Sequence, residues 1–181
     1  MRIAGVDPGT IETGIGIIEV NGKGPTVLFS RSIHAHRAKT IAARLEIIYT
    51  ELKITFEEWK PTVLAIENVF FQKDFKAAVK VGEARAVAML AAALSGIPVV
   101  EYPPARVKQS VCSNGRATKD QIQYMVRQLL GFKGPLTADS SDALAVALCH
   151  FHCHKFERLK NQLIPHHFSM KRTNIYGLQE R

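Results

Sequence analysis

The pattern of hydrophobic and polar positions changes its period along the chain. The first part contains short segments rich in Ile and Val that are separated by turn residues, which predicts strands at 2–7, 13–20 and 25–32. Asn21-Gly22, between the second and third segments, is typical of a hairpin. Because the connections are so short, we expect these three strands to pair in antiparallel fashion.

From about residue 38 the apolar positions follow helical spacing, which continues until Pro61. Beyond it the pattern predicts buried strands at 62–68 and 97–102, and helices at 75–95, 104–112, 118–130 and 138–159. This order predicts an α/β protein with a mixed five-stranded sheet, in which three antiparallel strands are followed by parallel ones, and helices on both faces. We assign residues 1–160 to one domain and 161–181, which lack sustained periodicity, to a mobile or accessory tail.

One predicted helix has no polar face in its second half, which reads AVAMLAAAL. Such a helix must be covered on both sides, by its own sheet and by something else. A partner subunit and a further helix of the same domain explain the pattern equally well.

Composition adds information about the partner and the compartment. The chain carries 24 Lys and Arg against 16 Asp and Glu, a net charge of +8, which favours an anionic partner such as nucleic acid. Three cysteines without disulfide spacing indicate a reducing compartment, and we predict a cytoplasmic location. No apolar run reaches the length of a membrane span, so we expect no membrane partner.

Four acids occupy positions where solvated acids are unusual. Asp7 and Glu67 each end an apolar strand, and Asp139 and Asp142 lie three residues apart on one face of an apolar helix. Each has a purely structural alternative: Asp139 as a helix N-cap, Asp142 as a favourable charge at the positive end of the helix dipole, Glu67 as the end of its strand, and Asp7 as the start of an Asx-turn. If the four converge, they repel one another unless a divalent cation joins them, and oxygen ligands suit Mg²⁺ or, in its place, Mn²⁺.

Two such cations at one site catalyse in-line displacement at phosphorus. A basic protein with an all-carboxylate metal site is therefore predicted to be a phosphodiester nuclease that binds two ions per active site. The residues 1–160 would then form the nuclease domain.

Several long motifs resemble the RuvC family of Holliday-junction resolvases. They are RIAGVDPGTIETGIGIIE, AIENVFF, ARAVAMLAAA, EYPPARVKQSVCSNGRATKDQIQYMV and ADSSDALAVALCH, in order over residues 1–155. The resemblance implies a ribonuclease H-like fold and symmetric Mg²⁺-dependent nicking of four-way DNA junctions in recombination and repair. It also implies a homodimer formed through helix 77–94 and cooperation with the branch-migration proteins RuvA and RuvB. The basic tail could bind these proteins or add non-specific DNA affinity, and the sequence does not choose between the two.

The resemblance assigns roles to individual residues. Asp7, Glu67, Asp139 and Asp142 correspond to the catalytic acids, although some members carry His at the position of Asp139. Lys108 and Lys119 match basic residues needed for cleavage, and Phe70 matches an aromatic residue that contacts bases. From their positions alone, we add as DNA-binding candidates Phe71, Lys73, Lys76, Lys80 and Arg116. The structural alternatives are solvated surface charges for the lysines and core packing for one of the two phenylalanines.

Three other functions share some of these features. A ribonuclease H-superfamily nuclease acting on structured RNA would share the acids but not the EYPPARVKQS and GRATK elements. The stretch DPGTIETGIG also resembles the phosphate loop of actin-like ATPases and sugar kinases, which would make the chain an ATP-binding protein. A junction-binding protein without catalysis is disfavoured by the complete acid set.

The segment CHFHCH at 149–154 suggests zinc at first sight. On a helix these side chains spread around the axis, and no second Cys/His cluster completes a four-ligand site. We therefore expect it to pack the end of the last helix or to form a basic, DNA-facing surface.

Overall fold

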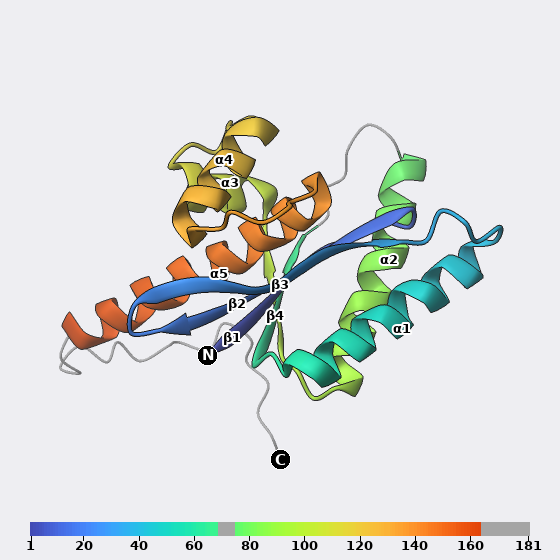
Figure 1. Ribbon diagram of the computed structural model, residues 1–181, viewed down its shortest axis with the longest axis horizontal. Coiled ribbons are helices and arrows are strands. Elements are labelled where there is room, and N and C mark those ends of the chain that lie inside the picture. Colours follow the sequence, from blue (N-terminus) through green and yellow to red (C-terminus); the bar gives the residue numbers. More distant parts are fainter. Residues whose placement is uncertain (69–74, 164–181) are drawn as a thin grey trace, which may run out of the picture.

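Five strands form one mixed sheet in the computed structural model, which describes residues 1–68 and 75–163 (Figure 1). The strands are β1 (Arg2–Asp7), β2 (Glu12–Asn21), β3 (Gly24–His34), β4 (Val63–Glu67) and β5 (Val99–Tyr102). Their order is β3-β2-β1-β4-β5, with β1, β2 and β3 antiparallel and with β4 parallel to both β1 and β5. The predicted mixed five-stranded sheet is confirmed.

Helices cover both faces of this sheet, as predicted (Figure 1). On one face lie α1 (Ile41–Trp59) and α2 (Phe75–Leu94). On the other lie α3 (Pro104–Cys112), α4 (Lys119–Leu130) and α5 (Ala138–Leu163). Within the described residues, no helix combines the length and the hydropathy that a membrane crossing requires.

Two hydrophobic clusters, one on each face, hold the layers together. Ile3 of β1 packs with Leu144 and Leu148 of α5, whereas its neighbour Ala4 belongs to the cluster that contains Leu52 of α1. Adjacent residues of a strand point to opposite faces, so a strand inside this sandwich must be apolar at every position. The unbroken apolar runs of β1 and β4 satisfy that requirement.

The ends of the elements follow local sequence signals. Thr118 caps α4 through a capping box with Gln121, and α4 ends at Gly131 in the left-handed conformation. The prediction that β5 is buried is wrong: three of its four residues are only partly buried and Glu101 is exposed, because β5 is the edge strand and pairs with β4 alone. The last helix continues to Leu163, a few residues past its predicted end.

The packing of α5 directly on β1 and β2 brings its first turn to one end of the sheet. A Cβ atom added at Gly5 would overlap the carbonyl oxygen of Ala143 and come within 2.9 Å of the amide nitrogen of Ala147. Glycine is therefore required at this position by the close approach of helix and strand, and the depth of α5 on the sheet depends on it.

Candidate active site

The four predicted acids come from three elements that end at the same place. Asp7 is the last residue of β1 and Glu67 the last of β4, and their preceding residues pair in the parallel register. Asp139 and Asp142 lie in the first turns of α5. Gly14 of β2 links these groups, because it lies opposite Asp7 and directly against the backbone of Asp139.

The electrostatics show that these carboxylates share one environment. The pKa of Asp7 is raised to about 7, first by burial and then by the negative charges of Asp142, Glu67 and Asp139 in that order. Burial and the charge of Asp142 also raise the pKa of Glu67. Burial raises the pKa of Asp142 as well, against the opposing effect of Lys119. Without a cation, the charged forms of these acids are destabilised by one another.

Two lysines oppose this negative charge. Lys119, the first residue of α4, places its Nζ 3.7 Å from Oδ2 of Asp142 while its side chain remains 82% exposed. The charge of Lys108, on α3, lowers the pKa of both Glu67 and Asp142. The structure therefore brings together all six residues that the sequence singled out for catalysis.

Asp139 does not act as the N-cap of α5, and Asp7 does not form an Asx-turn. Thr137, not Asp139, caps α5: the Ser140 N–H donates to Thr137 Oγ1 at 3.2 Å, and the Thr137 N–H donates to Ser140 Oγ at 3.0 Å. The turn after Asp7 is closed by Thr13, whose Oγ1 donates to the Gly9 carbonyl at 2.7 Å and accepts from the Gly9 N–H at 3.3 Å. Neither carboxylate is used for these local tasks.

Ser32 of β3 is a site residue that the sequence did not reveal. Its Oγ donates to Oδ2 of Asp139 at 3.3 Å and lies 2.7 Å from Thr137 Oγ1. This hydroxyl therefore holds the Asp139 carboxylate while Thr137 holds the helix terminus. The Thr137–Ser140 pair could have been recognised as a helix start, but Ser32 is too distant in sequence to give a local signal.

The donor set fits a hard divalent cation. All four groups are carboxylates. The pKa values of Asp7, Glu67 and Asp142 are raised, and the charge of Asp139 contributes to the raised pKa of Asp7 and of Asp142. The two lysines supply only part of the positive charge that would neutralise these acids. Oxygen-only sites of this kind suit Mg²⁺ and Mn²⁺.

The predicted DNA-binding residues are distributed differently. Lys76 and Lys80 of α2 line an open hollow of about 460 Å³. Its other polar or charged residues are Thr10, Lys39, Arg44 and the acidic Glu83. Arg116 lies exposed in the α3–α4 loop, where its N–H donates to Asn114 Oδ1 at 3.0 Å. Phe70, Phe71 and Lys73 lie outside the described residues.

The CHFHCH segment packs α5 against its neighbours, which agrees with the first of its two predicted roles. His150 Nδ1 lies 2.9 Å from the Tyr102 hydroxyl, and His152 Nδ1 lies 3.0 Å from the Ser110 carbonyl oxygen. Cys149 is fully buried in the cluster between α5 and the sheet. Among the described residues, these side chains do not form a group with metal-binding spacing.

Comparison with known proteins decides the family. The family model described as Crossover junction endodeoxyribonuclease RuvC matches residues 3–150. The chain belongs to the RuvC family. It is 40% identical to the RuvC of Pelobacter propionicus over 166 residues, which cover 92% of this chain and 94% of that one. It is 45% identical to the RuvC of Pelotomaculum thermopropionicum over 159 residues, 87% of this chain and 97% of that one.

A solved RuvC structure supports the same assignment. T. thermophilus RuvC in complex with Holliday junction substrate is similar with a TM-score of 0.80 and 31% identity, over 87% of this chain and 96% of that chain. The predicted resemblance and the ribonuclease H-like fold are thereby confirmed. The match also favours a RuvC nuclease over the ATP-binding alternative.

The raised pKa of Asp7 predicts how the stability of the metal-free protein depends on pH. The raised pKa of Asp7 means that the folded chain binds more protons than the unfolded chain between about pH 4 and pH 7. We therefore expect the metal-free protein to be most stable near pH 4–5 and to lose stability as the pH rises through 7. Urea unfolding at pH 5 and pH 8 measures this. Asp7→Asn should flatten the dependence, whereas Glu58→Gln, an exposed acid on α1, should leave it unchanged.

Proposed function

We propose that this RuvC chain resolves four-way DNA junctions by hydrolysing phosphodiester bonds at the site formed by Asp7, Glu67, Asp139 and Asp142. The observation that supports this most directly is the convergence of four acids, from three elements, in an environment that disfavours their unneutralised charge. The similarity to a RuvC solved with Holliday junction substrate supports the choice of DNA.

The four carboxylates would hold the metal, Mg²⁺ in the first place and Mn²⁺ as its substitute, with two ions per site. When bound, these ions would supply an activated water and would stabilise the leaving oxygen of an in-line displacement. The protein's own contribution is the alignment of the acids: β1 and β4 fix Asp7 and Glu67, and Ser32 fixes the carboxylate of Asp139.

The lysines would hold the scissile phosphate. Lys119 keeps most of its side chain in solvent, so its ammonium group can leave Asp142 and bind a phosphate oxygen. Lys108 approaches the same acids from α3. A positioned ammonium group at the reacting phosphate stabilises the charge that develops in the transition state.

A basic surface beside the site would hold the arms of the junction. Lys76 and Lys80 lie on α2 next to Lys39 and Arg44, around one open hollow. Phosphate contacts of this kind position DNA without reading its sequence. Arg116 would add a contact from the α3–α4 loop. We keep Phe70, Phe71 and Lys73 as proposed DNA contacts from the segment between β4 and α2.

We also propose that the chain works as a homodimer through α2. One side of this helix packs against α1 and the sheet through buried alanines, Ala84, Ala88, Ala91 and Ala92. The other side exposes a stripe of apolar side chains at helical spacing, which includes Val79, Leu90 and Leu94. A two-fold axis at this stripe would bury it and would give two active sites for two symmetric nicks.

The dimer proposal predicts the effect of one substitution. Leu90, which is 54% exposed, would be buried in the dimer, so Leu90→Glu should convert a dimer into a monomer at micromolar concentration. Analytical ultracentrifugation measures the change. Ile54→Glu is the matched control, because Ile54 is similarly exposed, at 50%, but lies on α1 rather than on α2, and should leave the dimer intact. A wild-type monomer would contradict the proposal.

Cleavage of three substrates tests the function itself. With Mg²⁺, the protein should introduce paired nicks into a synthetic four-way junction and leave a linear duplex and an RNA–DNA hybrid of the same sequence uncut. Preferential cleavage of the hybrid or of structured RNA would favour the ribonuclease alternative. Binding of the junction without cleavage in Mg²⁺ or Mn²⁺ would contradict the enzyme assignment.

The remaining expectations come from the sequence. Cooperation with RuvA and RuvB rests on the family resemblance, a cytoplasmic location on the cysteine pattern, and the division into a nuclease domain at 1–160 and a tail at 161–181 on the loss of periodicity. Residues 164–181 lie outside the described part of the chain.

A further inference from the structure

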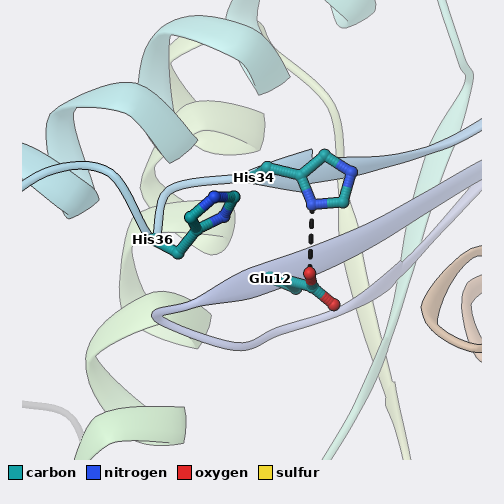
Figure 2. A group of neighbouring side chains, drawn as sticks. All are labelled: Glu12, His34 and His36. Atoms are coloured by element: carbon teal, nitrogen blue, oxygen red, sulfur yellow. Dashed lines mark hydrogen bonds and ion pairs between the residues drawn. The ribbon is translucent and has the colours of Figure 1, made fainter.

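A second group of potential metal ligands lies at the start of β2, at the end of β3 and in the turn after β3, and it includes none of the four acids. Glu12, His34 and His36 each offer one ligand atom, and these three atoms all lie within 4.8 Å of one another (Figure 2). His34 Nδ1 is 3.1 Å from Oε1 of Glu12. Within the described residues, this is the one group of three or more His, Cys, Asp or Glu side chains with such spacing.

The backbone explains why these three side chains meet. Glu12 and His34 are directly opposite each other in the antiparallel β2–β3 pair, so their side chains lie on the same face of the sheet. Ala35, between the two histidines, is fully buried, and its N–H donates to the Ile11 carbonyl at 2.9 Å. His36 lies in the turn that follows, in which the Ala38 N–H donates to the Ala35 carbonyl at 3.1 Å, and this turn brings its ring centroid within 5.9 Å of that of His34.

We propose that Glu12, His34 and His36 bind a Zn²⁺-like divalent cation, at a site separate from the four carboxylates. Two imidazoles and one carboxylate form a ligand set that Zn²⁺ favours, and three protein ligands leave a fourth position open to water or an anion. Imidazole ligands distinguish this site from the all-oxygen active site, which suits harder cations.

The geometry needs only small side-chain movements. Ligand atoms about 2.0 to 2.1 Å from a tetrahedral Zn²⁺ lie roughly 3.4 Å apart. The His34–Glu12 pair already lies at that separation, and all three side chains are exposed, so rotamer changes can bring His36 closer. His34 would bind through Nδ1, with its proton on Nε2, so that the metal replaces the present hydrogen bond to Glu12.

The site would join three segments beside the active site. Glu12 lies two residues before Gly14, the residue that contacts Asp139, and His34 lies two residues after Ser32, which donates to Asp139. His36 belongs to the segment that leads into α1. A bound cation would therefore link the start of β2, the end of β3 and this connection.

Calorimetric titration with ZnCl₂ tests the proposal on the full chain without a histidine tag, in millimolar Mg²⁺ to occupy the carboxylate site. We expect saturable binding that the double variant His34→Gln/His36→Gln weakens by roughly ten-fold or more, and Glu12→Gln by a smaller factor. The matched control His152→Gln/His154→Gln removes two histidines elsewhere and should keep this binding, as should Asp7→Asn. Circular dichroism checks that each variant is folded.

Histidine side-chain NMR locates the cation independently of affinity. Zn²⁺ should shift the imidazole resonances of His34 and His36 before those of the other histidines. Unchanged affinity in the His34/His36 variant would overturn the proposal, as would loss of affinity in Asp7→Asn or first shifts at His150, His152 or His154. A wild-type chain that shows no saturable Zn²⁺ binding would overturn it as well.

Discussion

Asp7→Asn is expected to abolish cleavage of a four-way junction, with a rate loss of about 10³-fold or more, and to leave junction binding nearly unchanged. Asp7 lies at the centre of the site, because all three other acids act on its pKa. The amide keeps the shape of the side chain but removes a charged metal ligand. It does not remove any of the basic surface that would bind DNA.

Two measurements separate ligand loss from misfolding. Cleavage is followed with a labelled junction in Mg²⁺, and binding with the same junction in Ca²⁺, which supports binding at oxygen sites. Glu58→Gln, an exposed acid remote from the site, is the control and should cut normally. Asp7→Asn protein that cuts at the wild-type rate would contradict the assignment of the active site.

The second large effect concerns the close packing of α5 against the sheet. Gly5→Ala is expected to reduce the free energy of unfolding by about 4 kcal/mol, enough to unfold a marginally stable domain. The added Cβ would overlap the backbone carbonyl of Ala143, and a backbone atom cannot rotate away as a side chain can. Urea unfolding followed by circular dichroism gives the free energy.

Gly82→Ala is the matched control for the same chemical change. Gly82 lies inside α2, and a Cβ there would have no neighbour within 4 Å. Because alanine favours the helix over glycine, this variant should gain up to about 1 kcal/mol. A Gly5→Ala protein as stable as Gly82→Ala would show that the helix and the strand are not in such close contact.

The elements of the fold were predictable where their signals are local. The strands β1 to β4 and the helices have clear periodicity and recognisable ends, such as the Thr118 cap. The incomplete burial of β5 was not predicted, because an edge position depends on the order of the strands rather than on the segment VVEY. An apolar strand looks the same in sequence at the edge and in the centre of a sheet.

The acids of the site were predictable for a different reason. A carboxylate at the end of a buried strand is costly, so Asp7 and Glu67 stand out against their apolar neighbours. Ser32 has no such contrast, and its contact with Asp139 spans 107 residues. The Glu12, His34 and His36 group was missed because it depends on the β2–β3 register, which brings Glu12 opposite His34.

The close packing of α5 on the sheet has a consequence for the spacing of the four acids. Asp7 and Glu67 belong to the sheet, whereas Asp139 and Asp142 belong to the helix, so the thickness of the helix–sheet interface sets the distance between the two pairs. Gly16, farther along β2, lies against the side chain of Leu144, where an added Cβ would come within 2.6 Å. We expect a larger residue there to displace Leu144, and with it α5, and so to change the spacing between the two pairs of acids without altering any of the four.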